Sequence, residues 1–470
     1  MSLQPLDLPE PTGNSQFSGI DPLDGRYYDP EISRYLSERT RILTQAHVEA
    51  ALAYGLAEFG LCSREIAEQI DAASRVIHVE DVAEEEKTTR HDVKAIVNTI
   101  KAQLPDEAKP YVHFGATSYD IVSTAMSLQL RRATAELVLP RLDSLISTLA
   151  ELAERYAETV QIGRTHGQHA VPITFGYMLA TYVQRLGESR RSLEVLSGKL
   201  KGKFSGAVGT YNAISVFVDD PLAFEKTVLG YVGLEPAPAA TQIVPAEGYI
   251  RLLDELAITA GVMANLSHDM RNLQRTEIGE VREKFEEGQT GSSTMAHKRN
   301  PWNFENIIGM WKQVTAQVVN ANLNISSEHQ RDLTDSSSAR FYTMSFALVA
   351  AMAKRLDGVM GKIEVDEEAM QRNLHLTRGA IAAEPLYLLL EKYGHTTAHE
   401  VSKALAHEAM ERNVSLYEVT SRAESIVDYW AKFTDAERDL IRSPETHYTG
   451  LAAQKVRILS VLRNDNNRAE

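Results

Sequence analysis

Cysteine, long apolar runs and excess positive charge are all scarce in this sequence, and each absence excludes a class of protein. Cys62 is the only cysteine among 470 residues, so no intramolecular disulfide bond can form, which fits a cytoplasmic protein. No run of about 20 apolar residues is present, so we expect no membrane-spanning helix and no membrane partner. The formal net charge of -15 argues against general nucleic-acid binding.

The beginning of the chain also lacks the features of a targeting segment. The first twenty residues are polar and rich in proline, without the basic start and apolar core of a signal peptide. We therefore expect residues 1–20 to form a loose tail. Over the whole chain, hydrophobic residues make up 43% and charged residues 24%, which is the balance of a globular protein.

Apolar residues recur at helical spacing over long segments, whereas the alternation typical of strands is rare. Leu142, Leu145, Leu149 and Leu152 follow one another at intervals of three or four, which predicts a buried helical stripe. Pro140 lies in the same segment and is expected to kink or interrupt the helix. Long helices of this kind are predicted at residues 124–160, 175–200, 249–281, 303–326 and 338–360.

These helices must bury their apolar stripes against one another, so we predict an all-α fold with a central bundle of long helices. Several stripes are wide enough to pack on two sides, which suggests that helices of other subunits complete the core. Two predicted linkers, KPYVHFGATS before the first long helix and GKIEVDEEAM after the last, set the domain boundaries. The predicted domains are an N-terminal helical domain, a central bundle domain and a C-terminal helical domain, at residues 1–115, 116–362 and 363–470.

Short polar clusters interrupt the helical pattern. Each combines Arg, His, Ser or Thr, the hydrogen-bond donors that suit carboxylates and phosphates. Most of them could equally be surface ion pairs or helix caps. The cluster at 290–306 resists that interpretation, because a structural turn does not need two serines, a lysine, an asparagine and a glutamate. The clusters are DPLDGRYY (21–28), TTRHDVKA (88–95), GATSYD (115–120), GRTHGQHA (163–170), TGSSTMAHKRNPWNFEN (290–306) and EHQRDLTDSSSAR (328–340).

The cluster at 290–306 carries a family resemblance. The pattern GSSxMxxKxNPxxxE, from Gly291 to Glu305, resembles the signature loop of the fumarase/aspartase superfamily. The segments DGRYY, RHD, TSYD, GRTHGQHAVPITFG and RDLTDSSSAR resemble the adenylosuccinate lyase family within it, in the same order along the chain. The resemblance covers about residues 20 to 410. One position departs from the family, which usually has proline where this chain has Ala296, so the loop is expected to be less rigid.

The resemblance implies a β-elimination in purine biosynthesis. Fumarate would leave adenylosuccinate to give AMP, and would leave succinylaminoimidazole carboxamide ribotide to give aminoimidazole carboxamide ribotide. Such a reaction removes a proton next to a carboxylate, stabilises the resulting charge and protonates the departing nitrogen. The family implies a homotetramer with active sites shared between chains. The sequence contains no Walker loop or metal-ligand spacing, so neither cofactor nor metal is expected.

The resemblance also assigns roles to individual residues. Ser292 would be the base, His166 the acid and Glu305 the partner of His166, while His91 matches a second active-site histidine. Lys298 and Asn300 would bind the fumarate carboxylates, beside Thr117, Ser118 and Thr165. The matching substrate-binding residues are Arg26, Tyr27, Arg90, His91, Asp92, Thr117, Ser118, Thr165, Gln242, Ser293, Lys298, Arg299, Asn300, Asn306, Arg331, Ser336 and Arg340.

Two other interpretations remain open at this point. A carboxymuconate cycloisomerase-like enzyme has a similar fold and a different reaction, but it does not need the arginine and serine residues matched to a phosphate. A non-catalytic structural relative is the second alternative. It predicts damage to Ser292, His166 or Lys298, and all three are intact.

Overall fold

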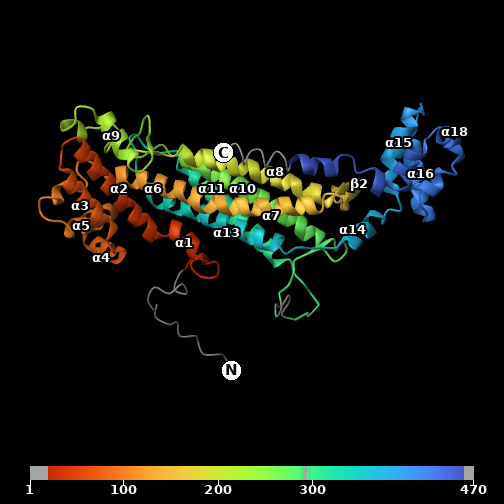
Figure 1. Ribbon diagram of the computed structural model, residues 1–470, viewed down its shortest axis with the longest axis horizontal. Coiled ribbons are helices and arrows are strands. Elements are labelled where there is room, and N and C mark those ends of the chain that lie inside the picture. Colours follow the sequence, from red (N-terminus) through yellow and green to blue (C-terminus); the bar gives the residue numbers. More distant parts are fainter. Residues whose placement is uncertain (1–19, 287, 289–293, 296, 460–470) are drawn as a thin grey trace, which may run out of the picture. The chain divides into compact units, whose positions relative to one another are not determined.

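The computed structural model describes residues 20–286, 288, 294–295 and 297–459, and it is built mainly from helices (Figure 1). The predicted all-α class is confirmed, since the described strands form only three small two-stranded sheets. The chain divides into two compact units, which are treated separately below. Unit 1 comprises Met1–Leu142, Ser189–Gly261 and Gly309–Lys354, and unit 2 comprises Asp143–Glu188, Val262–Ile308 and Arg355–Glu470. The three-domain division stays a prediction, and the expected tail lies outside the described residues except for Ile20.

Unit 1 contains a cluster of shorter helices around one apolar core. Helix α2 packs against α3, α6 and α9, and α4 packs against α5 (Figure 1). Leu52, Leu56, Ile70, Ile96 and Ile121 are among the fully buried side chains of this core. The elements that belong to unit 1 alone are α1 (Pro30–Leu36), α2 (Glu38–Glu58), α3 (Arg64–Arg75), α4 (Val79–Thr89), α5 (Asp92–Ala102), α6 (Ser118–Ala133), β3 (Lys201–Gly202), α9 (Pro221–Gly230), β4 (Glu235–Pro236) and α12 (Asp335–Ser338).

Unit 2 combines a β-hairpin with a group of short C-terminal helices. The hairpin strands β1 and β2 pair antiparallel, and β1 contacts α14. Helix α15 packs against α16 and α19 around buried leucines such as Leu386 and Leu390. The elements that belong to unit 2 alone are β1 (Val160–Thr165), β2 (Gln168–Thr174), β5 (Val281–Arg282), β6 (Glu364–Val365), α14 (Glu367–Leu374), α15 (Ala383–Lys392), α16 (Ala398–Arg412), α17 (Leu416–Thr420), α18 (Val427–Trp430), α19 (Asp435–Arg442) and α20 (Pro444–His447).

Long helices contribute residues to both units, and they confirm most of the helical pattern expected from the sequence. The predicted stripe is buried, since Leu142, Leu145 and Leu149 are fully shielded from solvent. The predicted helix ends are less accurate, because residues 160 and 281 lie in strands. These long helices are α7 (Leu139–Arg155), α8 (Phe175–Gly198), α10 (Glu247–Leu273), α11 (Trp302–Leu323) and α13 (Tyr342–Met360).

Pro140 interrupts the first long helix as expected, and the structure shows how. A π-helical turn at Thr134–Val138 separates α6 from α7, and Pro140 is the second residue of α7. A proline ring cannot donate a backbone hydrogen bond and collides with the carbonyl four residues earlier. The wider π turn, in which the Leu139 N–H bonds to the Thr134 carbonyl, moves the backbone away from that collision.

None of the described helices has the length and hydropathy that crossing a lipid bilayer requires.

Candidate functional site

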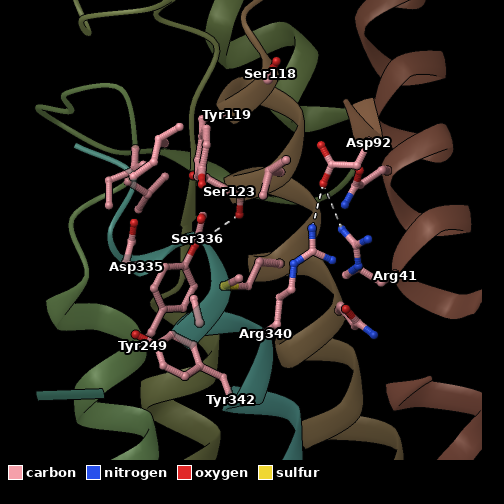
Figure 2. A pocket seen from close by; sticks show the side chains of 18 of the residues that line it. Arg41, Asp92, Ser118, Tyr119, Ser123, Tyr249, Asp335, Ser336, Arg340 and Tyr342 are labelled. Atoms are coloured by element: carbon pink, nitrogen blue, oxygen red, sulfur yellow. Dashed lines mark hydrogen bonds and ion pairs between the residues drawn. The ribbon is translucent and has the colours of Figure 1, made fainter. Parts of the chain in front are cut away.

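Unit 1 contains a cavity of about 410 Å³ where several of the sequence-predicted residues meet (Figure 2). Its walls come from α2, the junction of α4 and α5, most of α6, the segment 242–249 that leads into α10, α12 and the start of α13. Segments separated by more than 200 residues in the sequence therefore share one cavity. The predicted residues that line it are Arg90, His91, Asp92, Ser118, Gln242, Ser336 and Arg340.

The α4–α5 junction presents His91 to this cavity. Helix α4 ends at Thr89, and the left-handed backbone of its C-cap Arg90 (φ 51°) turns the chain directly into α5. His91 is the N-cap of α5, and its Nδ1 accepts a hydrogen bond of 3.4 Å from the Lys94 backbone N–H. Because Nδ1 is the acceptor, a neutral ring carries its proton on Nε2, which lies 3.4 Å from the Ser118 hydroxyl. His91 thus serves as a helix cap and directs an N–H towards Ser118.

Ser118 is the first residue of α6, and a capping box fixes its place. The Asp120 carboxylate accepts the Thr117 backbone N–H at 2.8 Å, and the Thr117 side chain reciprocates to the backbone of Asp120. Asp120 is buried against the ammonium group of Lys203 and also accepts the Gly206 N–H at 3.2 Å. Thr117 itself is not among the residues that line the cavity.

A network of alternating charges borders the cavity, and three of its members, Arg41, Asp92 and Arg340, line the wall. Asp92 lies between two guanidinium groups, with its Oδ2 at 2.8 Å from Arg340 Nη2 and 3.8 Å from Arg41 Nη1 (Figure 2). Glu38 contacts the same arginines, at 2.7 Å from Arg41 Nε and 3.5 Å from Arg340 Nη1. Burial opposes ionisation of Glu38, but the hydrogen bonds and charge of Arg41, together with Arg340, lower its pKa. Two cations and two carboxylates therefore neutralise one another.

Arg331, Tyr27 and Arg26 lie elsewhere in unit 1. The Arg331 side chain is only 5% exposed and faces inward, with Nη2 at 2.6 Å from Asp335 Oδ2 and 3.1 Å from the Asn324 carbonyl. It reaches the cavity only through Asp335, which is one of the lining residues. Tyr27 lines a second cavity of about 280 Å³, which shares Arg340 with the first. Arg26 is exposed and lines neither cavity.

In unit 2, Thr165 and His166 lie at the tip of the β1–β2 hairpin. Thr165 pairs with Gln168, so His166 and Gly167 form a two-residue turn, with φ of 54° and 72°. Positive φ at both central residues is typical of a type I′ turn. Glycine adopts that backbone freely, whereas a histidine there costs about 1–2 kcal/mol. The imidazole is exposed, and within the described residues no hydrogen bond or ion pair reaches it.

The remaining predicted residues lie around the start of α11. Glu305 is in the first turn of the helix and accepts a hydrogen bond of 3.0 Å from Arg271 Nε, so within the described chain it pairs with Arg271 and not with His166. Lys298 and Arg299 are exposed, and the Arg299 guanidinium lies 5.6 Å from the ring centre of Phe285. Asn300 is partly buried next to them and Asn306 is within α11. Ser292 and Ser293 lie outside the described residues.

Several cavity residues were not anticipated from the sequence. Arg41, Glu86 and Tyr249 come from regular helices, where no short pattern distinguishes them from surface or core positions. Tyr119 lies within the segment TSYD, so its position in that family-like segment could have identified it as a site residue. Burial, together with the charges of Asp335 and Asp92, raises the pKa of Tyr119 to about 12. Among the described residues, no three His, Cys, Asp or Glu side chains are grouped so that they could hold a metal ion.

Comparisons with known proteins connect this geometry to a family. Two family models match the chain, "Lyase" over residues 27–316 and "Adenylosuccinate lyase C-terminal" over residues 327–430. Adenylosuccinate lyase from Pyrococcus horikoshii is 39% identical over 444 residues, covering 93% of this chain and 96% of the relative. The corresponding protein of Methanocaldococcus jannaschii is 34% identical over 474 residues, covering 98% and 99%. That of Bacillus subtilis is 34% identical over 408 residues, covering 85% and 92%.

Solved structures show the same fold. A fumarate lyase from Mesorhizobium superimposes with a TM-score of 0.82 at 24% identity, covering 92% of this chain and 97% of that one. The 3-carboxy-cis,cis-muconate lactonizing enzyme of Pseudomonas putida gives a TM-score of 0.80 at 27% identity, covering 92% and 96%. Fold and sequence together define a lyase of the fumarase/aspartase superfamily. Within that superfamily, the chain belongs to the adenylosuccinate lyase family.

Proposed function

We propose that this lyase cleaves adenylosuccinate to AMP and fumarate. We further propose that it cleaves succinylaminoimidazole carboxamide ribotide to aminoimidazole carboxamide ribotide and fumarate, which would give it two steps of purine biosynthesis. The observation that carries the proposal is the unit 1 cavity, where residues from three separate polar clusters meet. The relatives named adenylosuccinate lyase, which match almost the full chain, support the same substrate.

The unit 1 cavity has the donors that a nucleotide requires. Arg340 presents a planar fork that suits a phosphate, and Ser336 and Ser118 add neutral hydroxyl donors. His91 and Ser118 also border the N-terminal ends of α5 and α6, where backbone N–H groups favour anions. Gln242 is available for the base or ribose. We assign Arg26, Tyr27, Arg90, Asp92 and Arg331 to the surroundings of this nucleotide site.

The elimination itself is assigned to the second group of residues. Ser292 takes the proton next to the carboxylate, and the electron pair left behind forms the fumarate double bond as the C–N bond breaks. His166 donates the proton that the departing nitrogen needs. Lys298 and Asn300, with Thr165 and Thr117, hold the carboxylates on which charge accumulates, and Ser293, Arg299 and Asn306 complete their surroundings. Each donor at a developing charge contributes about 2.7–4 kcal/mol to such a transition state.

A homotetramer with shared active sites would bring these residues together, and we place it in the cytoplasm. Exposed apolar side chains on two of the long helices support association, since Ile258 is 56% exposed, Val319 62% and Leu323 73%. Large side chains at such exposure lose contact with water when another chain covers them. The exposed imidazole of His166 would then meet Glu305 and the substrate across a subunit boundary. Sedimentation that shows an active monomer at micromolar concentration would contradict this assembly.

The direct test is turnover of purified protein, followed by the ultraviolet change as adenylosuccinate becomes AMP. The second ribotide is assayed in the same way, and 3-carboxy-cis,cis-muconate serves as the control substrate for the alternative reaction. We expect His166→Ala and Ser292→Ala to lower kcat by about 10²–10⁴-fold, as general acid–base catalysis predicts. Unchanged kcat in either variant would remove that residue from the mechanism. Turnover of the muconate alone would overturn the proposed substrate.

A further inference from the structure

A fully buried carboxylate in unit 2 connects to the strand that carries the His166 turn. Glu280 has no solvent-exposed surface, and it follows α10 in the chain. Its Oε1 accepts hydrogen bonds from Arg164 Nη2 at 2.6 Å and Asn373 Nδ2 at 2.7 Å. Its Oε2 accepts from Gln161 Nε2 at 2.7 Å and Arg164 Nη1 at 3.2 Å. Both oxygens are therefore satisfied, and Arg164 binds in the bidentate geometry that fixes orientation as well as distance.

Two of the three side chains that bind Glu280 belong to β1, immediately before the turn. Arg164 is separated from His166 only by Thr165, and Gln161 lies three residues further back. The register of the hairpin shifts between Ile162 and Arg164, so the regular strand ladder is interrupted at this position. Side-chain bonds to Glu280 consequently hold the part of β1 where backbone pairing is weakest.

Glu280 is itself held in place by the surrounding backbone. Its N–H donates to the Leu273 carbonyl at 3.0 Å, and its carbonyl accepts the Asp366 N–H at 2.9 Å. Asn373 adds a further connection, because its Nδ2 also donates to the Ile278 carbonyl at 2.9 Å. The carboxylate is thus a fixed point to which the hairpin is attached.

The His166 turn needs such support. A histidine with φ of 54° has an unfavourable backbone conformation, and such conformations persist only where the surrounding structure holds them. The imidazole makes no hydrogen bond within the described residues, so in this part of the chain the hairpin backbone determines its position. We propose that Glu280 is a positioning residue for His166, acting through Arg164 and Gln161, and this proposal rests on the catalytic role proposed for His166.

The test measures kcat, KM and melting temperature for variants of the full-length protein, with adenylosuccinate as substrate. Glu280→Gln keeps the shape of the side chain but replaces one acceptor oxygen by a donor, which faces the donors of Arg164, Gln161 or Asn373. We expect kcat to fall by about ten- to a hundredfold, because small displacements of a catalytic group have effects of that size, and KM to change less than about twofold. Wild-type kcat in Glu280→Gln would overturn the proposal.

Gln161→Leu and Asn373→Leu form a matched pair that separates positioning from stability. Both side chains are 2% exposed and both donate one bond of 2.7 Å to Glu280, but only Gln161 lies on the strand of the turn. We expect Gln161→Leu to lower kcat at least about threefold more than Asn373→Leu, with each assayed equally far below its melting temperature. Equal kcat in the pair would contradict the proposal. This comparison also decides the question if Glu280→Gln does not fold.

His166→Ala shows which hypothesis has failed if the results disagree. Loss of kcat in His166→Ala, with wild-type kcat in Glu280→Gln and Gln161→Leu, rejects only the positioning role of Glu280. Wild-type kcat in His166→Ala rejects the proposed acid and, with it, the reason for positioning that residue. A purely structural role for Glu280 would lower the melting temperature of its variants and leave the kcat of the folded enzyme unchanged.

Discussion

Replacing Lys203 by methionine tests whether the ion pair beneath the start of α6 determines the stability of unit 1. The Lys203 side chain is fully buried, its ammonium group contacts the Asp120 carboxylate, and it donates to the Gly206 carbonyl at 2.9 Å. Methionine fills a similar volume but leaves the Asp120 charge unpaired. Loss of one partner from a buried ion pair costs about 3–5 kcal/mol.

The remaining contacts of Asp120 place the expected loss at the lower end of that range. Its carboxylate keeps the Thr117 N–H at 2.8 Å and the Gly206 N–H at 3.2 Å, which continue to stabilise the charge. We therefore expect Lys203→Met to lose about 3 kcal/mol of unfolding free energy. At about 2 °C or less per kcal/mol for a long chain, the melting temperature falls by up to about 6 °C.

The assay is a thermal denaturation series at one protein concentration, which includes Asp120→Asn and the double variant. Removing both charges eliminates the unpaired carboxylate, so the double variant should be more stable than Lys203→Met. Wild-type stability in Lys203→Met would refute the reasoning. So would a double variant that melts at or below the temperature of Lys203→Met.

Further predictions concern pH, core packing and the hairpin. Burial opposes protonation of His113, but the carboxylate of Glu49, at 2.6 Å, outweighs it and raises the histidine pKa above 6.5. Wild type should therefore be more stable than Glu49→Gln, and this difference in stability should be largest below pH 6.5. The difference should shrink as the pH rises through the raised pKa of His113, which melting curves at several pH values measure. Leu149→Ala empties a fully buried position of α7 and should cost about 2–5 kcal/mol in chemical denaturation. Gly163→Ala should lower kcat, because an added Cβ would lie 2.7 Å from a backbone oxygen of β2. In the control variant Gly198→Ala the added Cβ meets no atom within 4 Å, so kcat should stay unchanged.

Each of these predictions has a contradictory outcome. A difference between wild type and Glu49→Gln that grows between pH 6.5 and 9 would show that the pair does not stabilise the protonated histidine. A loss below about 1 kcal/mol in Leu149→Ala would mean that the surroundings collapse into the space. Equal kcat in Gly163→Ala and Gly198→Ala would show that the hairpin tolerates the displacement.

The helices could be predicted from the sequence, because the buried face of a helix produces a regular spacing of apolar residues along the chain. A stripe such as Leu142, Leu145 and Leu149 repeats at the period of the helix itself, and all three side chains are buried. Helix ends were less accessible, since residues 160 and 281 carry apolar side chains that also suit a strand. The β1–β2 hairpin was missed for a related reason, because its turn uses His166-Gly167 and not the Asn-Gly pair that identifies such turns.

In the candidate site too, residues within short motifs could be predicted, whereas residues brought together only by tertiary packing could not. His91 and Ser118 were predicted through the family resemblance of their clusters, and both line the cavity. Arg331 was matched by the same resemblance and its role stays a prediction, since the structure shows only that its guanidinium binds Asp335, four residues away. Sequence alone does not separate an arginine that faces a ligand from one that faces a neighbouring carboxylate. Arg41 was not predicted from the sequence, because only tertiary packing brings this helical residue close to Asp92.

An acidic chain can bind an anionic nucleotide only if charge is compensated locally, and the cavity wall shows how. Arg340 and Arg41 are neutralised by Asp92 and Glu38, so the arginine side chains are ordered before any anion arrives. A phosphate that binds Arg340 must compete with these carboxylates, which reduces the net gain from each new contact. In return, the guanidinium fork needs little reorganisation. The starts of α5 and α6 follow the same rule, because Asp92 accepts the Val93 N–H and Asp120 accepts the Thr117 N–H, each at 2.8 Å, so an incoming anion meets helix ends whose positive dipole is already partly compensated.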